Sequence, residues 1–281
     1  MEKKAIVSKK IPFYLAPFRY LYRRISSLMF SDVRIIQITS NGIKYLLWAN
    51  EDIGKRMIVQ RQYEQGEMRA FAQLVRPGDV CVDVGGNVGI YSLNFAKLCT
   101  PTGRVYVVEP ISRNRLVIML AAEINSLPNI SVFPYALSSG EGEVELEIPS
   151  VDGAYAFIRP VGASGAPGTT KIRSLAFSKL LEEEHIERVD ILKIDVEGAE
   201  KLVLDGALEV LADKCKRPRV MMIELVDEFL GRYGSTVAEV LSIMGGIGYS
   251  AYYADANGRL RIFSEQDINR IFNVFFLLDR A

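Results

Sequence analysis

The segment VCVDVGGNVGIYSL, residues 80–93, decides the fold class of this chain. An apolar run of the buried-strand type enters a turn with three glycines and leaves it as a helix-type run, and nucleotide-like ligands bind at such turns. Asp83 closes the expected strand, where its carboxylate would repel the phosphates of a dinucleotide. The turn reads D-x-G-x-x-x-G instead of the dinucleotide pattern G-x-G-x-x-G. A cationic ligand such as S-adenosylmethionine, which has a sulfonium and an ammonium but no phosphate, therefore fits the turn better.

Strand-type and helix-type runs alternate on both sides of this segment. The expected strands cover residues 80–84, 105–109, 130–133, 190–195 and 220–225. The expected helices cover residues 64–75, 88–98, 112–125 and 199–211. Almost continuously apolar strands that alternate with helices predict an α/β fold with a mainly parallel sheet covered on both faces. Near the end of the chain, strands at 249–254, 259–263 and 273–278 should pair antiparallel at one edge of that sheet.

Two segments lie outside the alternating pattern. Asn41-Gly42 stands between two apolar runs, which predicts a β-hairpin over residues 33–48 ahead of the main unit. We therefore expect an N-terminal segment with a hairpin over residues 1–50 and a main domain over residues 51–281. Residues 138–172 are rich in Gly, Ser, Ala and Pro and contain a further expected hairpin strand at 144–148. This insertion is either a lid over the substrate or a disordered surface loop.

Composition and charge restrict the classes of partner. The 281 residues include 34 basic and 34 acidic side chains, so the chain as a whole has no bulk affinity for nucleic acid. Three widely spaced cysteines indicate reduced thiols and a cytoplasmic location. Residues 1–30 combine aromatic residues with seven basic side chains and contain no apolar run long enough to span a bilayer. This segment is a helix packed on the domain, a peripheral contact with the inner membrane face, or an arm that docks a partner, including a second copy of the chain.

Four carboxylates close expected parallel strands, and this is the edge at which such sheets bind ligands: Asp83, Glu109, Asp195 and Glu224. Glu109 follows the glycine turn by about twenty residues, the position from which a carboxylate binds ribose hydroxyls. The motif DVEGAE, residues 195–200, places further acids beside Asp195. One could hold a ligand ammonium and another could orient or deprotonate a substrate hydroxyl, while Glu200 could favour the first helical turn. Asp195, Glu197 and Glu224 could instead hold a divalent cation, and the sequence does not decide between these roles.

The order and spacing of these motifs resemble the FkbM family of class I S-adenosylmethionine-dependent methyltransferases. The resemblance covers about residues 50–278, and its most specific part is the string LKIDVEGAE at residues 192–200. The other matching motifs are Tyr63-Glu64, Pro77-Gly78, DVGGNVG at 83–89, Glu109-Pro110, Ala136-Leu137-Ser138 and Ile223-Glu224-Leu225. The sequence departs from the family at Leu175-Ala176, where a Leu-Asp pair is usual, and this puts the role of that loop in doubt.

The resemblance implies a Rossmann-like sheet of seven strands with the last strand antiparallel. It also implies methyl transfer from S-adenosylmethionine to a hydroxyl of a small-molecule or glycan acceptor. The implied cofactor contacts are Glu64 from outside the sheet, Asp83, Gly85, Asn87 and Gly89 around the methionine part, Glu109 at the ribose, Ala136 to Ser138 at the adenine, and Asp195. We expect Asp195 and Glu197 to be the catalytic residues and Glu224 to contact the substrate, with no resident metal.

Two other functions compete with this interpretation. A non-catalytic binding or scaffold protein could use the same fold, with the basic N-terminus as its docking element. A nicotinamide-dependent oxidoreductase could also use such a sheet, but the glycine spacing differs and no Tyr-x-x-x-Lys constellation is present. The acceptor itself depends on the least patterned segments, the N-terminal arm and the insertion at 138–172, and is not determined by the sequence.

Overall fold

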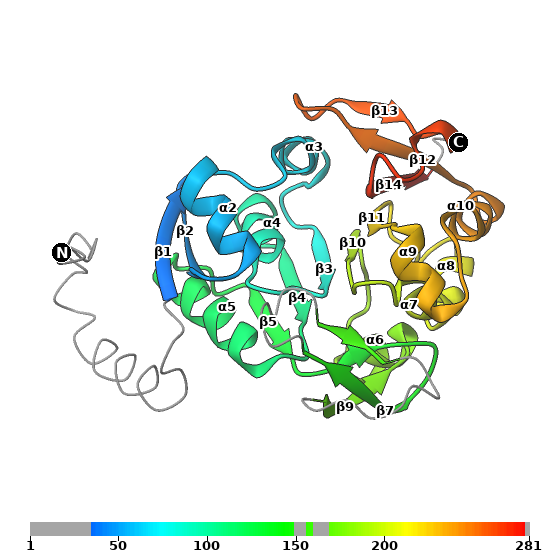
Figure 1. Cartoon of the computed structure of the whole chain (residues 1–281), viewed down its shortest axis with the longest axis horizontal. Helices are drawn as coiled ribbons and strands as arrows, with labels where there is room; N and C mark the ends of the chain where they lie inside the picture. The colour runs from blue at the N-terminus through cyan, green and yellow to red at the C-terminus, as the bar shows by residue number, and fades with distance from the viewer. Residues whose placement is uncertain (1–34, 149–155, 160–168, 279–281) are drawn as a thin grey trace, which may run out of the picture.

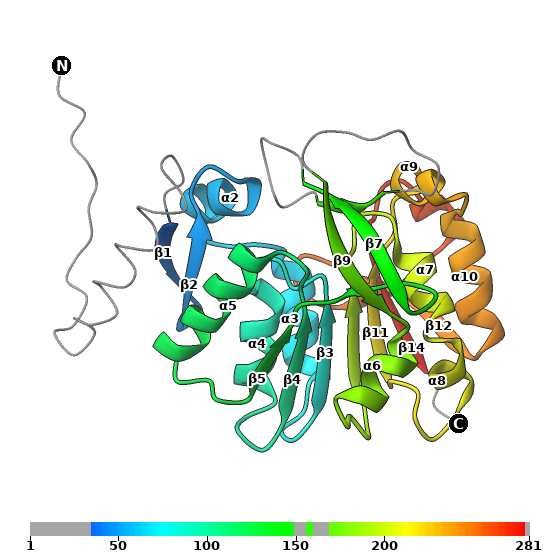
Figure 2. The same ribbon diagram turned by 90° about the horizontal axis from the view of Figure 1, so that it is seen from below.

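The central element of the structure, a computed structural model, is one eight-stranded sheet with helices on both faces (Figures 1 and 2). The structure describes residues 35–148, 156–159 and 169–278. The strands follow the order β13-β12-β14-β11-β10-β3-β4-β5. Their bounds are β3 Val80–Val84, β4 Arg104–Val108, β5 Ile130–Phe133, β10 Ile191–Ile194, β11 Val220–Glu224, β12 Tyr249–Ala254, β13 Leu260–Ile262 and β14 Asn273–Leu278. The predicted α/β fold with a mainly parallel sheet is confirmed, because β5, β4, β3, β10 and β11 pair in parallel.

The three C-terminal strands form the antiparallel group that the sequence predicts at one edge of the sheet. Within this group the last strand, β14, lies between β11 and β12. The eighth strand is β13, which pairs antiparallel with β12 at the edge. It forms because the chain reverses tightly after β12, where Gly258 N–H donates to the Asp255 carbonyl at 2.7 Å. The sheet therefore has one strand more than the seven that the resemblance implies, and this strand corresponds to the one predicted from the residues at 259–263.

Alternating side chains of the strands supply two apolar layers, one under each group of helices. Val82, Val84, Leu192 and Ile194 pack in one cluster with α6 Phe177–Glu183, α7 Glu200–Asp205, α8 Leu208–Ala212 and α10 Val237–Gly246. Cys81, Val105, Val107 and Ile191 face the other layer with α3 Gln65–Leu74, α4 Ile90–Leu98 and α5 Ser112–Ile124. This distribution is typical of a parallel sheet that is buried on both faces.

The predicted helix over residues 199–211 is divided into α7 and α8. Gly206 lies at the division, and a side-chain carbon there would come within 2.2 Å of the Ser138 carbonyl oxygen and 3.1 Å of Ala176 Cα. The missing side chain thus allows two distant segments to approach the helix pair closely. Ala176, where the family usually has an acid, precedes α6 at this packed junction.

The predicted N-terminal hairpin is present as β1 Ile35–Ser40 and β2 Ile43–Trp48, which pair antiparallel around Asn41-Gly42. A helix that the sequence analysis missed, α2 Asp52–Gln60, follows it. Both pack against α4 and α5 in an apolar cluster, in which Trp48 Nε1 donates to Asn114 Oδ1 at 3.1 Å. This packing brings α2 to the rim of the site described below.

The insertion and the residues next to it form an accessory sheet of four strands in the order β6-β9-β7-β8. Figure 2 shows two of them, β7 and β9, side by side. Its strands are β6 Ala136–Leu137, β7 Gly142–Glu147, β8 Phe157–Ile158 and β9 Thr169–Leu175. The expected hairpin strand at 144–148 corresponds to β7, which pairs antiparallel with β9 and β8. A small apolar cluster that includes Leu146, Ile158 and Ala199 joins this sheet to the main domain. Its predicted role as a lid stays a prediction.

The expectations for the N-terminal segment fall on residues 1–34, which lie outside the described residues. This applies to the N-terminal helix and to membrane contact through residues 1–30. Among the helices of the described ranges, none combines the length and apolar character that crossing a membrane requires.

Candidate active site

The site is a cavity of about 310 Å³ at the carboxyl ends of the parallel strands. The order of the sheet reverses between β3 and β10, because β3 is followed outward by β4 whereas β10 is followed by β11 on the other side. Open α/β sheets bind ligands at such a switch point. The described residues around the cavity come from the turn after β3, the end of β4, the turn after β10, the end of β11, α2 and the accessory sheet.

The glycine turn after β3 is fixed by the backbone of the neighbouring strand. Gly85 has φ +77°, and a side-chain carbon there would lie 1.8 Å from the Asp195 carbonyl oxygen. Its N–H donates to the Val108 carbonyl at 2.9 Å. Only glycine therefore fits this position, and the two ligand-side turns of the sheet pack directly on each other.

Glu109 is a buried carboxylate that organises the same turn. Its side chain accepts hydrogen bonds from the backbone N–H groups of Asn87 at 2.7 Å and Ile111 at 2.8 Å. Burial raises the pKa of Glu109 to about 7, although these two donors favour the charged form. The residue lines the cavity next to the turn, where its oxygens can accept bonds from ligand hydroxyls.

Lys193 is the central cation of the site, and its place in the strand sequence favours a structural role over a catalytic one. The side chain is almost completely buried, and Nζ lies 3.2 Å from carboxylate oxygens of both Asp83 and Asp195. It also lies 5.0 Å from the centre of the Tyr91 ring. Burial lowers the pKa of Lys193, and the two aspartates outweigh that effect and raise it. A lysine in an otherwise apolar, fully buried strand was the signal in the sequence.

Asp83 is not among the described residues that line the cavity. Its carboxylate is fully buried, accepts a hydrogen bond from Ser92 Oγ and pairs with Lys193, its register partner on β10. The structure thus places Asp83 behind the turn, although the sequence placed it against the ligand. Strand alternation explains the difference, because the side chain of Asp83 points into the layer below the turn and not out of the sheet edge.

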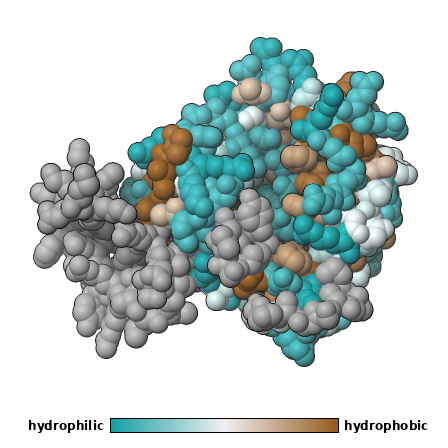
Figure 3. Space-filling model, in the orientation of Figure 1, coloured by the Kyte–Doolittle hydropathy of each residue, from teal (hydrophilic) through white to brown (hydrophobic). Residues whose placement is uncertain are grey.

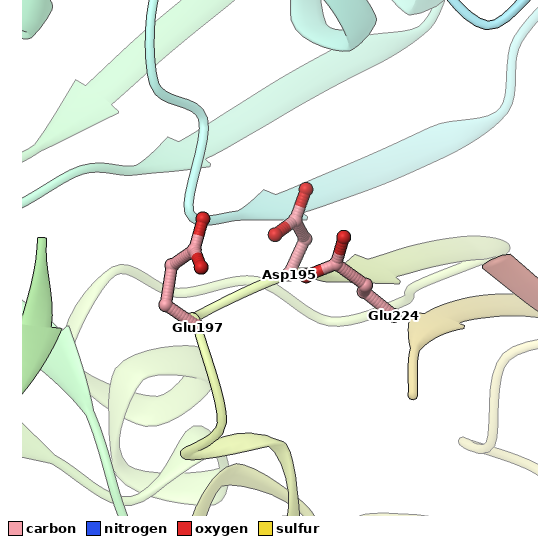
Figure 4. Close-up of side chains that lie close together, drawn as sticks. All are labelled: Asp195, Glu197 and Glu224. Atoms are coloured by element: carbon pink, nitrogen blue, oxygen red, sulfur yellow. The ribbon is translucent and has the colours of Figure 1, made fainter. Parts of the chain in front are cut away.

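The turn after β10 and the end of β11 bring three carboxylates together at the cavity. One oxygen each of Asp195, Glu197 and Glu224 lies within 4.8 Å of the other two (Figure 4). Burial, followed by repulsion from Asp195, raises the pKa of Glu197 to about 8 and raises the pKa of Glu224 well above its ordinary value. Such a group of oxygens can take up a proton, a ligand ammonium or a divalent cation. The predicted proximity of these acids is confirmed.

Glu200 has a different role from the other acids of this motif. It is buried, and its carboxylate accepts hydrogen bonds from the backbone N–H groups of Val196 at 3.0 Å and Gly198 at 3.1 Å. It therefore holds the turn in which Glu197 and Gly198 adopt φ values of +57° and +110°. Burial raises the pKa of Glu200 to about 7, against the effect of its two backbone donors.

Glu64 approaches the cavity from outside the sheet, as expected. It precedes α3 with φ +43°, lines the cavity, and accepts a hydrogen bond from the hydroxyl of Tyr91. Burial raises the pKa of Glu64, while the bond from Tyr91 lowers it. The partly buried Tyr63 lines the cavity beside it.

Some of the remaining predicted cofactor residues line the cavity, and the others do not. Ala136 lines the cavity together with Tyr135, whose ring stacks on Phe133 at 6.2 Å between centroids. Ser138 and Gly89 are not among the described lining residues. Ser138 Oγ lies 3.1 Å from Ser174 Oγ, and Gly89 allows Ile118 to pack closely against the start of α4. The sequence analysis missed Tyr135 and the contributions from α2, Leu146, Ile158 and Phe272.

Comparison with known proteins identifies the family. The family model described as Methyltransferase FkbM domain matches residues 83–251. Hexuronic acid methyltransferase AglP of Haloferax volcanii is 26% identical over 184 residues, which are 63% of this chain and 69% of that protein.

Two of the solved structures that match this chain are described as methyltransferases. Methyltransferase FkbM from Methylobacillus flagellatus has a TM-score of 0.45 and 12% identity, with coverage of 82% of this chain and 60% of that chain. A TehB-like S-adenosylmethionine-dependent methyltransferase from Corynebacterium glutamicum has a TM-score of 0.44 and 12% identity, with coverage of 80% and 94%. The family match over more than half of the chain confirms the prediction of a methyltransferase with S-adenosylmethionine as its donor. The chain belongs to the FkbM methyltransferase family.

Proposed function

We propose that this chain transfers a methyl group from S-adenosylmethionine to a hydroxyl oxygen of a sugar, glycan or other small acceptor. The observation that carries the proposal is the group of carboxylates from Asp195, Glu197 and Glu224, which shares one cavity with the glycine turn and Glu109. A hydroxyl acceptor must lose a proton during transfer, and the raised pKa values of Glu197 and Glu224 suit that task.

The residues of the cavity fit the cofactor. The lining carboxylates outnumber the lining cations, which suits the sulfonium and the ammonium of the ligand. Glu109 would accept hydrogen bonds from the ribose, and Ala136 with Tyr135 would contact the base. When bound, S-adenosylmethionine supplies a methyl group on a sulfonium that is already a good leaving group.

The protein residues then have to orient the acceptor and remove its proton. Asp195 is held by Lys193, and Glu197 lies in a turn fixed by Glu200. In this proposal one of the two accepts the hydroxyl proton, and Glu224 holds a neighbouring hydroxyl. The pKa of Glu197, raised to about 8 by burial and by Asp195, favours proton uptake near neutral pH. Orientation of the oxygen toward the methyl carbon supplies most of the remaining rate enhancement.

The nature of the acceptor rests on the related protein. AglP of Haloferax volcanii is named a hexuronic acid methyltransferase, and a sugar acceptor for this chain is proposed by that likeness. A peripheral contact of residues 1–30 with the inner membrane face would bring the enzyme to a lipid-linked glycan. That contact, a cytoplasmic location and a homo-oligomer remain proposals.

Ligand binding and one pair of variants test the function. Isothermal titration should show binding of S-adenosylhomocysteine and no binding of NAD to the purified full-length chain. Methyl transfer to a total glycan extract, followed with S-adenosylmethionine labelled in its methyl group, should fall about 100-fold or more in Asp195→Asn. Retained S-adenosylhomocysteine binding in that variant would show that the cofactor site is intact.

The same experiments can reject the proposal. Binding of NAD without binding of S-adenosylhomocysteine would exclude the methyltransferase function. Labelling that persists in the double variant Asp195→Asn, Glu197→Gln would exclude a role of these carboxylates in proton removal. Cofactor binding without any transferred label, combined with an unchanged cellular function of the double variant, would favour a non-catalytic binding protein.

A further inference from the structure

Phe272 is unusual among the exposed apolar residues because it lines the cavity. Within the described ranges, the large apolar side chains that remain exposed are Ile58, Val59, Met119, Leu208, Ile262 and Phe272. Of these six, only Phe272 is also part of the cavity wall, with 45% of the residue exposed. The face shown in Figure 3 is largely hydrophilic, with separate apolar patches. An exposed aromatic ring at a polar cavity indicates a ligand with an apolar face.

The backbone around Phe272 is rigidly held. The Phe272 carbonyl accepts a hydrogen bond from Leu225 N–H at 2.7 Å, and Asn273 is the register partner of Glu224 across β14 and β11. Phe272, Asn273 and Glu224 therefore occupy adjacent positions at the end of two paired strands, and all three line the cavity. Together they offer an aromatic face, an amide and a carboxylate, which can bind the carbon–hydrogen face and the hydroxyls of a sugar ring.

The charges around the cavity disfavour an anionic acceptor. Its described lining residues include the carboxylates Asp52, Glu64, Glu109, Asp195, Glu197 and Glu224. The lining cations in the same ranges are Lys193, which pairs with Asp83 and Asp195, and Arg56, which pairs with Asp52 at 2.7 Å. An acceptor carboxylate or phosphate would meet repulsion from the acids and no free positive partner among these residues.

We infer that Phe272, Asn273 and Glu224 form the acceptor subsite and that this subsite binds an uncharged, polyhydroxylated ring. The inference rests on the proposed function and narrows its substrate class to neutral sugars. It also separates this chain from a relative that is named for a hexuronic acid. In this chain, a carboxylate on the sugar would be a disadvantage at the subsite.

Matched neutral and acidic sugars test the charge preference. The probes are the methyl pyranosides of glucose, galactose and mannose and those of the corresponding uronic acids, titrated at pH 7.5 into the full-length chain saturated with S-adenosylhomocysteine. Saturation-transfer NMR should detect at least one neutral glycoside, with an affinity about tenfold or more above that of its uronic acid. Equal or tighter binding of the uronic acid, or no binding of any neutral glycoside, would overturn the inference.

Variants of Phe272 test whether its aromatic ring contacts the acceptor sugar. Phe272→Ala should weaken the neutral glycoside about tenfold and leave the affinity for S-adenosylhomocysteine within twofold, whereas Phe272→Trp should keep most of the glycoside affinity. Met119→Ala, which removes an exposed apolar side chain outside the cavity wall, is the control. Unchanged glycoside binding in Phe272→Ala would overturn the assignment of this residue.

The titrations distinguish a failure of the proposed methyltransferase function from a failure of the acceptor subsite. If the unaltered chain does not bind S-adenosylhomocysteine, the proposed function itself fails. If S-adenosylhomocysteine binds and the neutral glycosides do not, the acceptor subsite is wrong and the methyltransferase function stands. Retained S-adenosylhomocysteine binding also shows that Phe272→Ala is folded, so a loss of glycoside binding cannot be attributed to unfolding.

Discussion

The two strand-to-helix turns at the ligand edge are built differently. Beside the turn at residues 83–89, the buried carboxylate of Glu109 accepts hydrogen bonds from the backbone N–H groups of Asn87 and Ile111. At the turn of residues 195–200, oxygens of Asp195 and Glu197 lie within 4.8 Å of each other and of an oxygen of Glu224 at the end of β11. The first turn is a preorganised cradle whose geometry is set by backbone packing. The second turn holds negative charge that a proton, a ligand or a cation must balance.

The difference matches two tasks in one reaction. A cofactor that must be held in one orientation needs a rigid binding site, and rigidity comes from satisfied backbone groups and close packing. A group that takes up a proton near neutral pH needs a pKa above that of an ordinary carboxylic acid, and buried, mutually repelling carboxylates provide it. Lys193 connects the two turns, since it pairs with Asp83 below the first and Asp195 in the second.

The largest expected effect comes from breaking the contact between the turns. In Gly85→Ala the new methyl group would meet the Asp195 carbonyl oxygen at 1.8 Å in a left-handed backbone conformation. We expect a loss of about 4 kcal/mol in unfolding free energy, measured by urea denaturation, and no detectable S-adenosylhomocysteine binding. Gly140→Ala, where the space around the glycine is open, is the control and should change stability by less than about 0.5 kcal/mol. A stable Gly85→Ala variant with normal binding would disprove the packed arrangement.

A smaller effect should appear in the pH dependence of the second turn. Burial raises the pKa of Glu200 from 4.5 to about 7, so the native state keeps a proton that the unfolded chain releases. This contribution to stability is complete below about pH 4.5 and is lost as the pH rises to about 7, a difference of about 3 kcal/mol. In Glu200→Gln the glutamine carbonyl can still accept the two backbone hydrogen bonds but does not titrate.

Urea unfolding at pH 4.5 and pH 7.5 measures this difference. The unaltered chain should lose more stability between the two pH values than Glu200→Gln does, by about 3 kcal/mol. Glu228→Gln, at an exposed position on α9 (Asp227–Leu230), should behave like the unaltered chain. Equal pH dependence of Glu200→Gln and the unaltered chain would show that Glu200 is ionised in both states, and the contrast between the turns would weaken.

The smallest expected effect comes from the hydrogen bond that Tyr91 donates to Glu64, next to the turn at residues 83–89. Tyr91→Phe removes the hydroxyl that donates to Glu64 and leaves the ring near Lys193 in place. Loss of a hydrogen bond to a buried carboxylate should cost about 1 to 2 kcal/mol of stability, with a weaker affinity for S-adenosylhomocysteine by calorimetry. Tyr106→Phe, at a tyrosine of β4 in the opposite apolar layer, serves as the matched control. An affinity equal to that of the control would remove Glu64 from the cofactor site.

Much of the fold followed from local sequence patterns. The apolar strand ends, the glycine turn at 83–89 and the hairpin at Asn41-Gly42 depend on side-chain period and on backbone preferences of a few residues. The same reasoning located Glu109 and the acids of residues 195–200, because parallel strands share one carboxyl edge. It placed Asp83 in the ligand site, since the end of a strand shows which edge a residue occupies but not into which layer its side chain packs.

The sequence by itself therefore determined the order of strands and helices, the family, and the acids at the ligand edge, all of which are encoded within short segments. The tertiary structure decided the position of β14 between β11 and β12, the burial of Lys193 between Asp83 and Asp195, and the placement of Phe272 and Glu224 in the wall of one cavity. These features arise from contacts between segments far apart in the chain. Their free energies depend on packing and desolvation at the contact, and no local pattern carries that information.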